Sequence, residues 1–247
     1  MKKILTIEEG VRSVLSVYNA VPDIKWEYRP AEEGCLTDAI VLDGAVYPLF
    51  WWRCDTQIMA LAENAPERKL CSMKLNRTCA KSYGIDRLMY QEIDIAELML
   101  DSKIESVMCF DNGCARNMLA TMKNKRVAIF ELAAVLNDCT AEQGRHIYWG
   151  QDGMASDRVV SQKVASDAIY LFSEDEAKPE VFNDIFIYMY GLNKTDVVKA
   201  ACIAEILMGW RDISDWKEKD AHYRRCLAAA AESDRTCRRT LIREAEV

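Results

Sequence analysis

Helical periodicity marks the first hundred residues and the last fifty. Apolar residues recur at helical spacing over residues 7–20, where Thr6 is a candidate N-cap, and again over residues 86–101. The end of the chain predicts two more helices, over residues 194–208 and 215–233, because apolar positions again return every three or four residues.

The middle of the chain changes to the alternating period of β-strands. Asp111-Asn112-Gly113 and Lys123-Asn124-Lys125 are expected to be turns between strands, because Asn and Gly tolerate a positive φ. Residues 182–191 (FNDIFIYMYG) are expected to form either a final strand or a loop packed on the core. The segments that predict strands are IKWEY (24–28), AIVLDG (39–44), KLCSMKL (69–75), IESVMCF (104–110), ARNMLATM (115–122), RVAIFELAAVL (126–136), RHIYWG (145–150), VVSQKV (159–164) and AIYLFS (168–173).

This order of elements predicts an α+β fold with a large, mostly antiparallel open sheet and helices on one face. In residues 127–134 both alternating sets of side chains are mostly apolar. The second face of the sheet is therefore expected to be an oligomer interface, since an open apolar face needs a cover. We expect a helix-rich segment over residues 1–80, packed on a main sheet domain over residues 81–247.

Charge and hydropathy exclude two classes of partner. The 247 residues carry a formal net charge of −7, which disfavours a nucleic-acid backbone as a partner. The basic run at residues 235–243 is followed by two glutamates and is expected to be solvated. No apolar run approaches the roughly 20 residues that span a bilayer, so no membrane segment is expected. The amino terminus acquires Glu8 and Glu9 too early for a signal peptide.

The ten cysteines are scattered singly, with no Cys-x-x-Cys pair. Cys109 and Cys202 lie in apolar surroundings, where a reduced thiol acts as a small hydrophobic side chain. This pattern indicates a reducing, cytoplasmic location. Because His146 and His222 are the only imidazoles, no metal site is expected.

The motifs that bind phosphates and dinucleotides do not occur in the sequence. None of the ten glycines forms a Gly-x-Gly-x-x-Gly, and neither a Walker loop nor a nucleophile elbow is present. Gly150-x-x-Gly153 follows a strand, but it is expected to be a hairpin turn. We therefore expect this chain to bind no cofactor alone, so that any NAD(P) would come through a partner subunit.

Lys81, Tyr83 and Asp86 are the acid–base candidates, because each of these residue types can move a proton when it is desolvated. The alternative for Asp86 is that it caps the helix that begins there.

Other polar and aromatic residues have structural interpretations. His146 lies on a strand and is expected at a surface or an interface rather than in catalysis. Trp149 and the pair Trp51 and Trp52 are expected in the core or an interface rather than as a sugar-binding platform.

Several segments in the same order resemble the Gfo/Idh/MocA family of oxidoreductases, which includes glucose–fructose oxidoreductase and inositol dehydrogenase. The family's F-x-N-G hairpin with its later glutamate is similar to residues 123–125 with Glu131. Its Y/F-G-T-x-G segment is similar to residues 149–153, and its closing helix and tail to residues 222–242, where Cys237 replaces a glycine. The family's H-x-x-D, at the start of a helix, is similar to residues 83–86.

This chain departs from the family at positions that matter for chemistry. The family's catalytic histidine would fall on Tyr83, and the aspartate four residues earlier on Cys79. The amino terminus resembles the segment after the family's E-K-P motif, with Lys2 or Lys3 near its lysine, but the proline is not present. The resemblance thus implies the family's carboxy-terminal domain alone, with the amino-terminal nucleotide-binding domain missing.

Three hypotheses follow for function. The first is a subunit of a hetero-oligomeric carbohydrate oxidoreductase, whose nicotinamide is held by a separate chain. The second is a non-catalytic homodimeric scaffold or sugar-binding module. The third is a cofactor-independent lyase or isomerase that uses Lys81, Tyr83 and Asp86.

Overall fold

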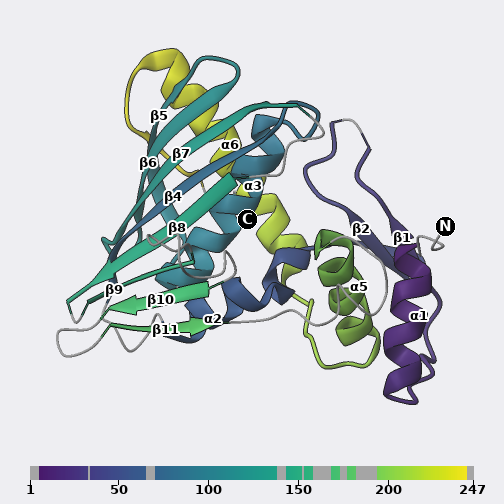
Figure 1. Cartoon of the computed structure of the whole chain (residues 1–247). Helices are drawn as coiled ribbons and strands as arrows, with labels where there is room; N and C mark the ends of the chain where they lie inside the picture. The colour runs from purple at the N-terminus through teal and green to yellow at the C-terminus, as the bar shows by residue number, and fades with distance from the viewer. Residues whose placement is uncertain are drawn as a thin grey trace. The chain divides into compact units, whose positions relative to one another are not determined.

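The chain divides into two compact units, which are described separately (Figure 1). The computed structural model describes residues 6–32, 34–64, 70–137, 143–151, 153–157, 168–172, 177–181 and 194–243. Unit 1 comprises Met1–Met59 and Asn183–Asp220, and unit 2 comprises Ala60–Phe182 and Ala221–Val247. This division differs from the expected boundary after residue 80, because residue 80 ends a strand inside the main sheet of unit 2.

Unit 1 combines helices with a small antiparallel sheet. Helix α1 begins with a capping box, in which Thr6 and Glu9 each accept a hydrogen bond from the other's backbone N–H. The strand order of the sheet is β1–β2–β3. The elements of this unit are α1 (Ile7–Val17), β1 (Trp26–Arg29), β2 (Ala39–Leu42), β3 (Ala45–Pro48), the 3₁₀ helix η1 (Trp51–Cys54) and α5 (Lys194–Leu207), and helix α2 (Thr56–Asn64) begins in it.

Aromatic residues fill the core of unit 1. The ring of Phe50 lies 5.5 Å from that of Trp52 and 5.0 Å from that of Trp216, measured between centroids. Trp51 and Trp52 are both buried, which confirms the prediction of a core role. Asp38 is also buried in this unit and is neutralised by Lys199, whose Nζ lies 2.7 Å from Asp38 Oδ2.

Unit 2 is built on a nine-stranded sheet with the order β11–β10–β9–β8–β4–β7–β6–β5–β12. The strands of the described residues pair antiparallel except β4 and β7, which are parallel. The strands are β4 (Leu70–Ala80), β5 (Ile104–Asp111), β6 (Ala115–Met122), β7 (Val127–Leu136), β8 (Gln143–Gly150), β9 (Gly153–Ser156), β10 (Ala168–Phe172), β11 (Ala177–Val181) and β12 (Thr240–Leu241).

Two helices, α3 (Ile85–Leu100) and α6 (Trp216–Thr236), lie on the same face of this sheet (Figure 1). The carboxy-terminal half of α6 is tied to β5, because the Ser233 hydroxyl and the Asp234 carboxylate accept hydrogen bonds from the backbone N–H groups of Cys109 and Asp111. The expected α+β architecture, a mostly antiparallel sheet with helices on one face, is thus confirmed.

Most of the predicted elements are present in the structure. Gly150 pairs with Gly153 at the β8–β9 hairpin, as expected, and Gly113 adopts a φ of +86° in the β5–β6 turn. The predicted strand at 159–164 and the segment at 182–191 lie outside the described residues. Among the described helices, none is both long enough and apolar enough to cross a membrane.

The other face of the sheet is open in the described part of unit 2 and carries exposed apolar side chains among polar ones. Along β7, Ala128 and Phe130 are buried beneath the helices, while Ile129 between them is partly exposed on the opposite face. Strand register places Ile129 beside Leu119, and both side chains project from this open face. The exposed large apolar residues of the face are Phe110, Leu119, Ile129, Val135 and Trp149.

Candidate functional site

The corner where β4 turns into α3 holds the three acid–base candidates. Lys81 and Tyr83 are fixed through their backbones, because Lys81 N donates to Leu136 O and Tyr83 N donates to Ala80 O. Gly84 is the helix N-cap, with φ +84° and ψ 143°, a conformation that is essentially restricted to glycine. The sequence Tyr-Gly at this point therefore allows a sharp entry into the helix.

Tyr83 and Asp86 are held by different partners. The Tyr83 hydroxyl donates a 2.9 Å hydrogen bond to Gln91 Oε1, and the Arg87 guanidinium lies 4.5 Å from the centre of the Tyr83 ring. Asp86 Oδ1 lies 2.7 Å from Arg116 Nη1. The Lys81 side chain is exposed. The corner thus carries an exposed lysine, a phenol oriented by Gln91 and a carboxylate paired with Arg116.

Asp86 is not the helix cap that the sequence offered as an alternative. Gly84 occupies that position, and no side chain makes a capping hydrogen bond there. Asp86 lies instead in the first turn of α3, where its charge is stabilised by the positive end of the helix dipole and by Arg116. Arg116 also pairs with Asp111. Burial opposes the charge on Arg116, but these two carboxylates raise its pKa.

Nearly two turns after Asp86 along α3, Glu92 is completely buried and faces the sheet. Its Oε1 accepts a 2.6 Å hydrogen bond from Arg77 on β4, and its Oε2 lies 2.8 Å from His146 Nε2 on β8. Gly144, which pairs with Arg77, leaves room for this arrangement, because a Cβ at that position would lie 2.7 Å from Arg77 Cγ. The carboxylate therefore has two cationic partners.

His146 completes this buried charge cluster, so its expected place at a surface or an interface is wrong. It is 4% exposed, and its Nδ1 contacts Asp157 Oδ2 while its Nε2 contacts Glu92. A sequence signal for this contact existed. In the β8–β9 hairpin Gly150 pairs with Gly153, so each step back along β8 is matched by one step forward along β9. Four steps from this pair, Asp157 lies opposite His146.

The electrostatics of the cluster favour a protonated imidazole. Burial alone would lower the pKa of His146, but the carboxylates of Asp157 and Glu92 outweigh it and raise the pKa to about 10. Burial likewise opposes the charged forms of Glu92 and Asp157, and their cationic neighbours nevertheless lower the pKa of each carboxyl. An imidazolium held between two carboxylates is suited to structure or proton storage, since neither ring nitrogen is free to act as a base.

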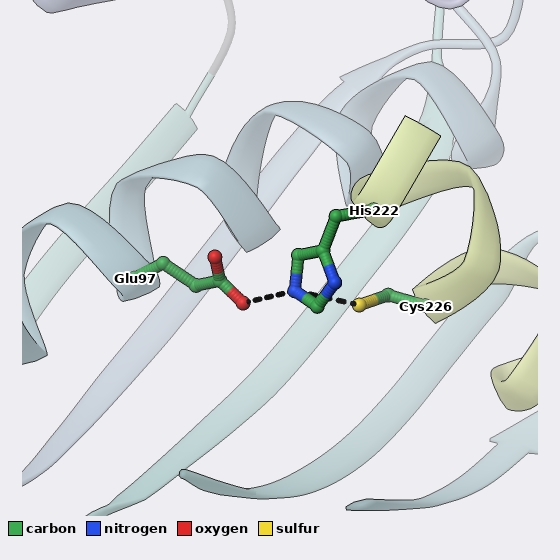
Figure 2. Close-up of side chains that lie close together, drawn as sticks. All are labelled: Glu97, His222 and Cys226. Atoms are coloured by element: carbon green, nitrogen blue, oxygen red, sulfur yellow. Dashed lines mark hydrogen bonds and ion pairs between the residues drawn. The ribbon is translucent and has the colours of Figure 1, made fainter. Parts of the chain in front are cut away.

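The opposite side of α3 faces α6. The Tyr223 hydroxyl donates to Asp94 Oδ1, and both residues are buried. One turn later, Glu97 Oε1 lies 2.7 Å from His222 Nε2, and Cys226 Sγ lies 3.6 Å from the same nitrogen (Figure 2). No local sequence signal connects these residues, because 125 positions separate Glu97 from His222.

Sequence comparison finds no relatives, since no protein-family model matches and no curated protein is similar enough to match. Solved structures do match. An oxidoreductase from Agrobacterium radiobacter, in complex with NAD+, L-tartaric acid and magnesium, aligns with 96% of this chain at 11% identity and a TM-score of 0.63. A probable dehydrogenase from Thermotoga maritima aligns with 78% at 14% identity and 0.57. The scyllo-inositol dehydrogenase from Lactobacillus casei aligns with 78% at 12% identity and 0.53.

These neighbours are described as oxidoreductases and dehydrogenases, and the chain shares their fold. It spans 70%, 63% and 62% of the lengths of the Agrobacterium, Thermotoga and Lactobacillus chains, respectively. The likeness in three dimensions therefore agrees with the resemblance that residues 83–86, 123–131 and 149–153 indicated.

Replacing His146 with glutamine should destabilise unit 2 strongly. The substitution removes the imidazolium and leaves Asp157 without its charged partner in a buried setting, which costs about 3–5 kcal/mol of unfolding free energy. Urea unfolding followed by circular dichroism measures the change. Lys125→Ala is the matched control, because it removes the exposed ion pair with Glu105 and should change the free energy of unfolding far less. Equal effects of the two substitutions would contradict the assigned cluster.

The stability of the protein should fall as the pH rises above neutrality. His146 has a raised pKa, so its contribution is complete below the ordinary histidine value of 6.5 and is lost as the pH rises towards about 10. Glu92 and Asp157 have lowered pKa values, so their contribution is present above the ordinary carboxyl range and is lost in acid. Urea midpoints measured at several pH values should therefore be highest in the weakly acidic range. His146→Gln should flatten the alkaline side of this profile, and an unchanged slope would refute the assignment.

Proposed function

We propose that this chain is a Gfo/Idh/MocA-related component of a carbohydrate oxidoreductase and works as a subunit beside a separate chain that binds NAD(P). The observation that carries the proposal is the shared fold. Its match to the Agrobacterium oxidoreductase, a protein solved with NAD+ and L-tartaric acid, extends over 96% of this chain. A hydroxylated carbon compound is thus the substrate class that we infer.

The β4–α3 corner is the part of this chain that we assign to the substrate. Lys81 supplies an exposed ammonium group, which can bind a hydroxyl or carbonyl oxygen. Tyr83 supplies a phenol that is oriented by Gln91, and Asp86 a carboxylate at a helix N-terminus. An alcohol oxidation needs a group that accepts the hydroxyl proton, and Asp86 and Tyr83 are the candidates for it.

We assign the nicotinamide to a partner because this chain lacks the glycine pattern of a dinucleotide-binding turn. Hydride transfer requires the cofactor to lie against the substrate carbon, and a dinucleotide is normally held where a glycine-rich turn lets its pyrophosphate approach a helix N-terminus. The β4–α3 turn has one glycine, Gly84, and the sequence has no Gly-x-Gly-x-x-Gly.

Two exposed apolar surfaces support assembly with other chains. The open face of the nine-stranded sheet carries Leu119, Ile129 and Trp149 among polar residues such as Lys74 and Glu131. In unit 1, Tyr18 packs edge-on against Trp210 with 5.0 Å between the ring centroids, and both remain more than half exposed. Exposed apolar patches of this kind mark interaction sites. We assign the sheet face to pairing with a second copy of this chain or with the cofactor-binding chain.

A second candidate function is a dimeric scaffold or sugar-binding module without catalysis. The engagement of Asp86 with Arg116 favours it, because a carboxylate in an ion pair is a weaker base than a free one. The two candidates differ in whether Asp86 is needed for turnover.

The sheet face should control the oligomeric state. Ile129→Glu replaces an exposed apolar side chain of the open face, between Leu119 and Lys74, with a carboxylate. Burying that extra charge in an interface would be costly, so the variant is expected to sediment as a monomer. Val46→Glu is the control, since Val46 is a similarly exposed apolar residue on β3 in unit 1. Analytical ultracentrifugation of both variants and the wild type measures the effect. A wild-type chain that is monomeric at high micromolar concentration would exclude this assembly.

Nicotinamide-dependent oxidation should require the partner and Asp86. The purified chain alone is expected to bind no NAD(H) in calorimetry, whereas the complex purified from the native host should reduce NAD(P)+ with a polyol or sugar. In that complex Asp86→Asn should lower kcat by about 100-fold or more, as for loss of a general base. Asp101→Asn, at the other end of α3, is the control and should leave kcat unchanged.

Each alternative predicts a different result. Stoichiometric binding of NAD(H) by the chain alone would contradict the assignment of NAD(P) binding to a separate subunit. A complex without redox activity, with sugar binding that is insensitive to Asp86→Asn, would favour the scaffold.

A further inference from the structure

A second polar cluster of unit 2 lies between α3 and α6 and plays no part in the function proposed above. Glu97 projects from the last turns of α3, and His222 and Cys226 project from α6 toward it (Figure 2). His222 and Cys226 are four residues apart, so they lie on the same side of their helix, one turn from each other. The three residues therefore converge because two helices pack side by side.

The three donor atoms are close to the spacing of a tetrahedral metal site. Glu97 Oε1, His222 Nε2 and Cys226 Sγ all lie within 4.8 Å of one another. Zinc bonds of about 2.0–2.3 Å at tetrahedral angles require neighbouring donor atoms to be about 3.3–3.6 Å apart. The distance of 3.6 Å between His222 Nε2 and Cys226 Sγ meets this requirement. The distance of 2.7 Å between His222 Nε2 and Glu97 Oε1 is shorter than this spacing, so these two atoms would have to move slightly apart to bind an ion.

The surroundings of the cluster suit a bound ion. The side chains of His222 and Glu97 are 7% and 9% exposed, and Cys226 is buried. Glu97 Oε1 also accepts a 2.6 Å hydrogen bond from Ile104 N, which fixes the carboxylate as groups around metal ligands commonly do. Next to the cluster, the hydrogen bond between Tyr223 and Asp94 holds the two helices together.

The donor set selects the class of metal. Calcium and magnesium prefer oxygen ligands alone, whereas one imidazole, one thiolate and one carboxylate suit zinc and similar first-row ions. A thiolate and a carboxylate together also neutralise a divalent charge, which removes the cost of burying it. Three protein ligands leave the fourth position for a water molecule.

We propose that Glu97, His222 and Cys226 form a site for a zinc-type divalent metal ion that ties α6 to α3. The ion replaces the direct hydrogen bond between His222 and Glu97 and links residues that are far apart in the sequence. This inference does not depend on the oxidoreductase proposal, because the ion is a structural link and none of its three ligands is among Lys81, Tyr83 and Asp86.

Cobalt is the probe for the test, since a Co²⁺–thiolate bond gives a charge-transfer absorption that zinc does not show. The full chain, freed of metal with a chelator, is titrated with Co²⁺ and then with Zn²⁺. We expect one equivalent of Co²⁺ to produce the thiolate band, Zn²⁺ to displace it, and Zn²⁺ to raise the thermal midpoint. Absence of a thiolate band in the wild type would overturn the proposal.

Variants of the three ligands locate the site. Cys226→Ala keeps a small apolar side chain in the core and should abolish the band, and His222→Gln should lower Co²⁺ affinity by about 100-fold or more, the upper end of what loss of an outer-shell partner costs. Cys114→Ser removes an exposed thiol and should leave the titration unchanged. Retention of the band in Cys226→Ala would show that another thiol binds the metal and would refute the site.

Glu97→Gln is a second, gentler variant in case Cys226→Ala does not fold, as judged by circular dichroism. Its amide oxygen can still accept the hydrogen bond from Ile104 N, so the helix packing should persist. Because it removes a negative ligand, it should weaken Co²⁺ binding by at least tenfold. Unchanged affinity in this folded variant would exclude Glu97 as a ligand. Every readout here is independent of nicotinamide turnover, so failure of this proposal and failure of the proposed function are separable.

Discussion

The pairing of buried charge along helix α3 is the constraint on which unit 2 depends. Helix α3 carries Glu92 and Asp94 into the interior without exposure, and Glu97 with little. A buried carboxylate without a partner is far costlier than any single packing defect, so the neighbours of α3 must supply cations or donors. They come from three other elements: Arg77 on β4, which directly precedes α3, His146 on β8, and the pair His222 and Tyr223 on α6. The interactions that satisfy the buried carboxylates of α3 also hold the sheet and helix α6 against it.

Local sequence pattern was sufficient for the elements but not for their long-range contacts. Alternation of apolar residues located β5, β6, β7 and β8, and the Asn- and Gly-containing turns separated them, because a strand and a turn are each determined by neighbouring residues. The parallel pairing of β4 with β7 could not be predicted in this way, since more than fifty residues separate the paired positions, such as Ser72 and Val127. Helix α3 shows the same difference. Its apolar positions predicted a helix over residues 86–101, whereas nothing in the pattern predicted the burial of Glu92 and Asp94.

The candidate site was likewise predictable only where its residues are neighbours in the sequence. Lys81, Tyr83 and Asp86 follow one another in sequence, so their place at the β4–α3 corner follows from the end of a strand and the start of a helix. The burial of His146 was missed, although hairpin register alone would have placed Asp157 beside it. The cluster of Glu97, His222 and Cys226 had no local signal, because it exists only when α6 packs on α3.

The long stretch of sequence between α3 and α6 has a consequence for synthesis. While the chain is being made, α3 and the strands that follow it leave the ribosome long before Tyr223 and His222 do. Asp94 and Glu97 therefore lack their final partners during this interval. Strand β5 remains an unpaired edge until Thr240 and Leu241 arrive to form β12. The nascent sheet therefore exposes both buried-charge positions and a free strand edge until residues 222–241 have been made, and this is the interval in which a chaperone would be most useful.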